Sequence, residues 1–165
     1  MLKQRIKDYV NSHRDEIVST LMELVKIPSV STDRISCDKM QLAVRSLYEN
    51  YGFSVTEGEE YILAHFGDGK EEIGLFAHSD VVDGGEGWLL TPPFEPIIHE
   101  GVIVGRGAWD DKSAVVHSFY ALRALEELNI PITKKVVAFI GFNEENGMSD
   151  IKNYIKCFLR KIFWQ

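Results

Sequence analysis

The stretch KKVVAFIGFNEENG, residues 134–147, joins an unbroken apolar run to a pair of acidic residues. A short apolar run bounded by polar residues is typical of a strand that is buried on both faces of a sheet. A segment at 112–128 precedes it, and its apolar residues recur at helical spacing. Amphipathic helices are also predicted at 3–26 and 38–50. Helices that alternate with apolar strands predict an α/β sandwich with a mostly parallel sheet.

Three more strands are predicted between the second and third helices. The segments FSVTE (53–57), YILAHF (61–66) and EIGLFAH (72–78) are rich in β-branched and aromatic residues. The segment FEPIIHEGVIVGRG (94–107) is typical of a β-hairpin, with its turn at Glu100–Gly101. The chain has 165 residues, which suits one domain with a substantial core.

The composition disfavours several classes of protein. The formal net charge is −7, which argues against a nucleic-acid partner because phosphate neutralisation needs clustered Lys and Arg. The longest apolar run is too short to span a membrane, and the N-terminal residues MLKQRIKDYV lack the apolar segment of a signal peptide. Cys37 and Cys157 are far apart and lack metal-site spacing, which indicates free thiols in a reducing compartment. We therefore expect a cytoplasmic protein that binds neither membrane nor nucleic acid.

Polar residues follow the strand predicted at 72–78. In the stretch LFAHSDVVDGGEGW (75–88), His78 and Asp80 stand at the end of the strand. A metal-bound imidazole needs its second ring nitrogen anchored, commonly by a carboxylate, and a His-x-Asp pair can supply both groups. The alternative is a strand-end histidine beside a capping aspartate, with no metal.

Acidic pairs occur at two more places in the chain. In GRGAWDDK (105–112), Asp110 and Asp111 directly precede the predicted third helix. One aspartate suffices to cap a helix, so the second carboxylate is left free to bind or bridge metal ions. Glu144 and Glu145 follow the apolar strand, where one carboxylate can bind a metal while its neighbour takes a proton from water. The alternatives are a helix cap and a charged surface loop.

In open α/β sheets, ligands bind outside the carboxyl ends of the strands. All three polar clusters are predicted at that edge of the sheet. Together they supply one imidazole and several carboxylates. Such a set of nitrogen and oxygen donors suits zinc, with manganese or cobalt as substitutes. A nucleotide site built on GDGK (67–70) is disfavoured, because no Walker A Lys-Ser/Thr follows a long glycine loop and the acidic pairs repel phosphate.

The motifs HSDVV, GRGAWDDK and NEENG, in this order and spacing, resemble those of the co-catalytic zinc exopeptidases. This family includes glutamate carboxypeptidase, aminoacylase, succinyl-diaminopimelate desuccinylase and the peptidase V-type dipeptidases, and the chain is most similar to the dipeptidases. The resemblance covers residues from about 15 to 155. It implies a three-layer αβα sandwich with a mixed, mostly parallel sheet. It also implies a hydrolase of peptide or N-acyl amide bonds, acting on a small peptide or N-acyl amino acid.

The resemblance further implies roles for five residues. His78 would bind one zinc ion, Glu145 would bind a second, and Asp110 would bridge the two. The peptide bond that follows Asp110 is cis in the family. Asp80 would orient His78, while Glu144 would act as the general base and later deliver the proton to the leaving amine.

The resemblance ends before the chain does. Residues 157–165, CFLRKIFWQ, depart from the family pattern, and we interpret them as a divergent tail produced by a frameshift or truncation, after a family-like part at 1–156. The lid domain, a further Asp ligand and a distal His ligand of the family cannot be assigned. Each zinc ion would keep two protein ligands, so we expect weak metal binding and little or no turnover. The alternative is a non-catalytic remnant that associates with itself, for example as a homodimer, through bare apolar surface.

Overall fold

The computed structural model of the protein describes residues 1–163. Helices and strands alternate along the chain, as the sequence predicts. Their bounds are α1 (Leu2–Ser12), α2 (Arg14–Val25), α3 (Arg34–Tyr51), β1 (Ser54–Gly58), β2 (Tyr61–Phe66), β3 (Glu72–His78), β4 (Ile97–His99), β5 (Val102–Val104), α4 (Lys112–Glu127), β6 (Lys135–Gly141) and α5 (Ser149–Phe163).

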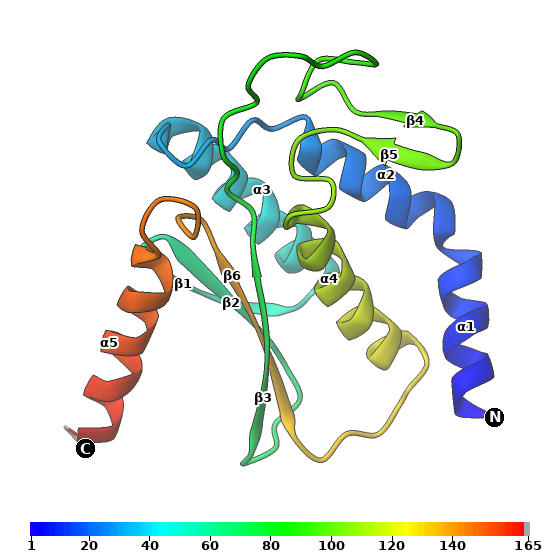
Figure 1. The fold of residues 1–165 in the computed structure, drawn as a ribbon. Coiled ribbons are helices and arrows are strands. Elements are labelled where there is room, and N and C mark those ends of the chain that lie inside the picture. The colour runs from blue at the N-terminus through cyan, green and yellow to red at the C-terminus, as the bar shows by residue number, and fades with distance from the viewer. Residues whose placement is uncertain (164–165) are drawn as a thin grey trace.

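The main sheet has the strand order β1-β2-β6-β3 and is mixed, as predicted (Figure 1). β3 and β6 run parallel, whereas the β1–β2 and β2–β6 pairs are antiparallel. The expectation of a mostly parallel sheet is therefore wrong for the strands that the structure describes. The physical reason is that β1 and β2 form a tight hairpin, which reverses the chain without a crossover helix.

Helices cover both faces of this sheet, which confirms the predicted three-layer sandwich (Figure 1). Successive residues of β2 and β6 point to opposite faces, so each strand serves two cores. The core shared with α3 and α4 contains Ile62, Ala64, Ala138, Ile140, Met40, Val44, Val116 and Phe119. The core under α5 contains Tyr61, Leu63, Val137 and Phe139, with Ile151 and Tyr154 packed against them.

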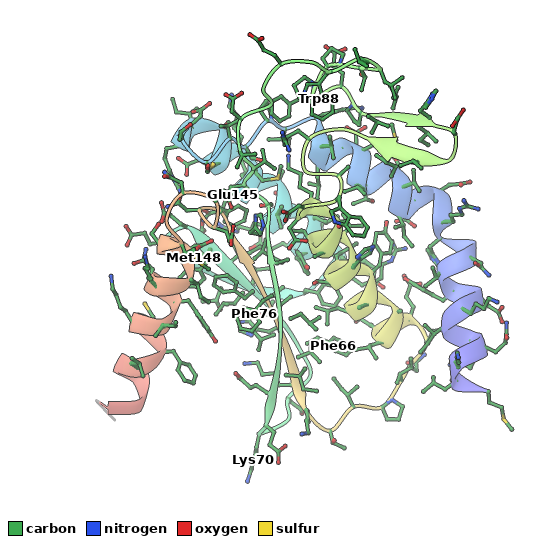
Figure 2. All side chains as sticks on the ribbon, viewed as in Figure 1. Phe66, Lys70, Phe76, Trp88, Glu145 and Met148 are labelled. Atoms are coloured by element: carbon green, nitrogen blue, oxygen red, sulfur yellow. The ribbon has the colours of Figure 1, made fainter. Side chains whose placement is uncertain are left out.

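β3 is an edge strand of the described sheet, and one of its two edges has no neighbouring strand. Phe76 of β3 is 59% exposed and its ring centroid lies 5.4 Å from that of Phe139 (Figure 2). An aromatic side chain this exposed on an open strand edge is unusual for a monomeric soluble protein. The edge is a candidate surface for association.

The N-terminal helix predicted at 3–26 is two helices, with a break at His13. The residue has φ −103° and ψ 10°, outside the helical range. The carbonyl oxygen of Tyr9 accepts hydrogen bonds from the Ser12 hydroxyl and from His13 Nδ1, both at 2.9 Å. The His13 N–H also donates to this oxygen at 3.1 Å, so several donors meet one carbonyl group where α1 ends.

The second helix begins four residues before the predicted start. Asp33 caps it, because its Oδ1 accepts from the N–H groups of Ile35 at 3.1 Å and Ser36 at 3.3 Å. Its predicted end is confirmed, since Gly52 has φ 101° and follows the last helical residue. The start was missed because the apolar periodicity becomes clear only after the first helical turn.

The other predicted elements are present close to their expected bounds. The hairpin of β4 and β5 turns at Glu100 and Gly101, whose φ values are 50° and 80°. Helix α5 was not predicted, and it runs through the expected boundary at residue 157. The divergent tail at 157–165 stays a prediction, and residues 164–165 lie outside the described part. Among the described helices, none is both long and apolar enough to cross a membrane.

Candidate metal centre

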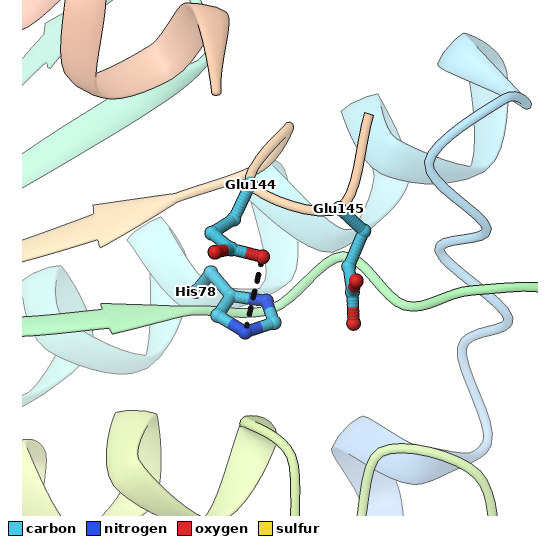
Figure 3. A group of neighbouring side chains, drawn as sticks. All are labelled: His78, Glu144 and Glu145. Carbon is cyan, nitrogen blue, oxygen red and sulfur yellow. Dashed lines mark ion pairs between the residues drawn. The ribbon is translucent and has the colours of Figure 1, made fainter. Parts of the chain in front are cut away.

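The parallel pairing of β3 with β6 brings the first and last polar motifs together. His78 is paired with Gly141 at the carboxyl ends of these strands, and Glu144 and Glu145 follow three and four residues later. His78, Glu144 and Glu145 each offer one ligand atom, and these atoms lie within 4.8 Å of one another (Figure 3). The expected meeting of these residues at one sheet edge is confirmed.

Asp80 holds the two halves of this group in place. Its carboxylate is fully buried, and Oδ1 and Oδ2 accept hydrogen bonds from the backbone N–H groups of Glu144 and Glu145, each at 3.1 Å. His78 Nδ1 lies 3.0 Å from the backbone oxygen of Asp80 and 3.5 Å from its Oδ1. The backbone carbonyl is therefore the nearer partner of the imidazole, while the carboxylate mainly positions the glutamate loop.

The other ring nitrogen of His78 faces the remaining acids. Its Nε2 lies 3.2 Å from Asp110 Oδ1 and 3.8 Å from Glu144 Oε2. Burial lowers the pKa of His78, but the hydrogen bond and charge of Asp80 and the charge of Glu144 outweigh this effect and raise the pKa to about 9. Nδ1 contacts Asp80, so Nε2 is the ring nitrogen that faces Asp110 and Glu144.

The aspartate pair has the expected backbone geometry. The Asp110–Asp111 peptide bond is cis, as the resemblance implied. The Asp110 side chain is 71% exposed and points its Oδ1 at His78. Asp111 stands at the N-cap position of α4 but makes no side-chain cap hydrogen bond, and its Oδ2 instead accepts from the His78 backbone N–H at 3.4 Å. Helix capping alone does not account for the pair, which favours the metal-site interpretation.

Two buried charged residues beside the group were missed by sequence reasoning. Lys112 has no exposed surface, and burial lowers its pKa to about 7. Asp150 is 2% exposed, accepts from the Asn143 backbone N–H at 3.2 Å and lies where a side chain on Gly141 would be. The only sequence signal for either was a charged residue next to a motif, which does not reveal burial.

A pocket of about 180 Å³ adjoins the centre. Its apolar wall includes Phe76, Phe139 and Met148, and its polar wall includes His78 and Glu144. An apolar pocket with a few convergent polar groups is the usual form of a small-molecule site. The pocket thus places an apolar surface beside His78 and Glu144.

The donor atoms present fit a divalent cation. One imidazole nitrogen and several carboxylate oxygens form a set that zinc accepts. Among residues 1–163, His78, Glu144 and Glu145 are the group whose ligand atoms converge in this way, and Asp110 contacts it through His78. The structure thus supports a metal-binding group, and which ion it takes is a matter for proposal.

Residues 74–163 of the chain match the model of peptidase family M20/M25/M40. The chain belongs to this family. The match includes all three motifs and extends through α5. The predicted family is therefore confirmed.

Similar proteins include several dipeptidases. The chain is 31% identical over 161 residues to a candidate dipeptidase of Staphylococcus aureus strain USA300, covering 91% of this chain and 34% of that protein. Human carnosine dipeptidase 1 superposes with a TM-score of 0.87 at 25% identity, over 99% of this chain and 39% of that one. An M20 family metallo-carboxypeptidase from Sulfolobus solfataricus gives a TM-score of 0.72 at 24% identity, over 88% and 35%. The chain spans about a third of the length of the curated relatives it matches.

Proposed function

We propose that the chain provides part of the catalytic centre of a zinc-dependent dipeptidase or deacylase. The substrate would be a small peptide or N-acyl amino acid whose amide bond is hydrolysed. The observation that carries this proposal is the convergence of His78, Glu144 and Glu145 within 4.8 Å at the carboxyl ends of two parallel strands. The similar proteins, which are named as dipeptidases and a metallo-carboxypeptidase, support the same substrate class.

Each residue has a distinct role in this proposal. His78, through Nε2, Asp110 and Glu145 would hold the metal ions, with Asp110 placed to share them. Bound zinc supplies Lewis-acid catalysis, which polarises a carbonyl group and makes water a stronger nucleophile. Glu144 takes the proton from the attacking water and returns it to the leaving amine. Asp80 positions Glu144 and Glu145 through their backbone N–H groups.

Ligand number limits what the described residues achieve alone. In this assignment each zinc ion has two protein ligands, whereas catalytic zinc usually has three. Weak metal binding and little or no turnover by the isolated chain follow from this count. Manganese or cobalt, which accept similar donors, are expected to substitute for zinc.

Metal content is the direct test. The purified chain is dialysed to equilibrium against buffers of known free zinc concentration, and bound zinc is measured by elemental analysis beside Asp110→Ala. Bound zinc that falls in the variant supports the proposal, and absence of zinc from both proteins contradicts it. Hydrolysis of simple dipeptides is assayed in parallel with Glu144→Ala. Turnover that disappears in this variant would support the base and refute the expected inactivity.

A second candidate is a non-catalytic domain that associates with itself. Phe76, at 59% exposure on the open edge of β3, favours it. A homodimer through this edge would bury the ring and pair the free backbone groups of the strand. The proposed cellular location, in either case, is the cytoplasm.

A further inference from the structure

Lys112 directly follows the aspartate pair and is fully buried. Its Nζ donates hydrogen bonds to the backbone oxygens of Leu24 at 3.1 Å and Ile27 at 2.6 Å. Leu24 lies in the last turn of α2, and Ile27 follows the end of that helix. The ammonium group therefore sits at the C-terminal end of a helix that contributes no residue to the candidate centre.

A fully buried ammonium group requires a specific reason. Removing an amine cation from water is costly unless its protons are paired with acceptors. Within the described part of the chain, the recorded partners of Nζ are the two carbonyl oxygens and no carboxylate. Helix C-terminal carbonyls carry partial negative charge and lack partners within the helix, so they suit a cation. The two carbonyl oxygens are thus the hydrogen-bond partners of the ammonium group, and the charge of Asp80 also favours its protonated form.

The loop before the aspartate pair is built around the lysine stem. Gly107 has φ 83°, and a Cβ there would lie 3.1 Å from Cδ and 3.2 Å from Cε of Lys112. The backbone N–H of Lys112 also donates to the Gly107 oxygen at 3.1 Å. The loop thus closes over the stem, and Asp110 and Asp111 lie in the segment between these two contacts.

We propose that Lys112 is a positioning residue that fixes the Asp110–Asp111 segment to the end of α2. Through this link the helix stabilises the metal-binding geometry of the aspartates. The proposal rests on the proposed function to the extent that Asp110 is taken as a metal ligand. The positioning itself concerns the backbone and can be measured without metal.

Hydrogen exchange of the metal-free chain tests the link. We compare the wild-type protein with Lys112→Met, which keeps the length of the stem but removes the donor and the charge. Loss of hydrogen bonds made by a charged group should raise exchange about tenfold in residues 107–113 and in residues 24–28 together. The matched control is Leu122→Ala, a fully buried change in the same helix that should not affect these two segments selectively.

Zinc affinity provides the second readout. Lys112→Met should weaken zinc binding about tenfold, whereas Leu122→Ala should bind as the wild-type protein does. Unchanged exchange in residues 107–113 overturns the positioning role, whatever happens to the affinity. If the wild-type chain binds no zinc, the proposed function fails while the exchange data still decide the link. If Lys112→Met does not fold, Lys112→Gln, which keeps a polar head group, is judged by the same exchange criterion.

Discussion

Replacing Asp80 by Asn tests the side chain that joins the two strands of the candidate centre. In the protein, its two carboxylate oxygens each accept one N–H, from Glu144 and from Glu145, at 3.1 Å. Asparagine has nearly the same shape but one acceptor oxygen. One of the two backbone N–H groups must therefore face the amide NH₂ group and lose its partner.

The expected loss of stability follows from these two contacts. A hydrogen bond to a charged acceptor contributes about 1.5–3 kcal/mol, and a buried donor without a partner costs about 1–3 kcal/mol. Asparagine has no charge to bury, and the lower cost of desolvation offsets part of the lost stability. We expect Asp80→Asn to lower the free energy of unfolding by about 3 kcal/mol, a large share of the roughly 5–15 kcal/mol of a typical domain.

Urea unfolding in the presence of EDTA measures this effect without a contribution from bound metal. The control is Asp83→Asn, the same chemical change three residues further along the chain. Asp83 is exposed and its Oδ1 accepts one N–H, from Gly85 at 2.8 Å, so the expected change is small. A loss below about 1 kcal/mol in Asp80→Asn, equal to that of the control, would refute the reasoning.

Three further predictions concern pH, packing and association. In metal-free protein, the raised pKa of His78, about 9, stabilises the fold fully below pH 6.5, and this stabilisation is lost as pH rises through 9. The lowered pKa of Lys112, about 7, destabilises the fold fully below pH 7, and this destabilisation is relieved as pH rises from 7 toward 10.5. Between pH 7 and 8.5 the two contributions change with pH in opposite directions, so their slopes cancel in the wild-type protein. The free energy of unfolding should therefore rise by about 1.4 kcal/mol per pH unit in His78→Gln and fall as steeply in Lys112→Met. Parallel curves for the two variants would contradict this. Gly141→Ala should cost about 2 kcal/mol in urea unfolding, because its Cβ would lie 2.0 Å from Asp150 Oδ2, and unchanged stability would show that this carboxylate moves freely. Phe76→Asp should shift any concentration-dependent dimer to monomer in sedimentation analysis, and a dimer that persists would exclude the β3 edge as its interface.

The proximity of His78 to Glu144 and Glu145 could be predicted from the ends of two apolar strands and from the general position of ligand sites in α/β sheets. Apolar runs ending in polar residues identify strand ends, and the carboxyl ends of parallel strands share an edge. The direction of pairing between β2 and β6 could not be predicted, because the apolar pattern of a strand is the same in both directions. The sheet was for this reason expected to be more parallel than it is.

The break at His13 and the helix α5 were missed for different reasons. At His13, the helix is divided by the backbone conformation of one residue, with side chains bonded to the Tyr9 oxygen, and an apolar repeat contains no such information. In α5, the last residues differ in composition from the preceding acidic chain, and this difference obscures their helical spacing. The apolar residues Ile151 and Tyr154 nevertheless pack on the sheet, as an amphipathic helix requires.

The candidate centre depends on backbone groups more than its side-chain motifs indicate. Asp80 accepts hydrogen bonds from two N–H groups of the glutamate loop, and Lys112 donates to two carbonyl groups at the end of α2. Both charged residues thus act on parts of the chain more than sixty residues away in sequence. Because backbone groups are the same for every residue, no motif can reveal these partners. Backbone groups thus hold in place the segments that carry His78, Glu144 and Glu145, whose ligand atoms converge.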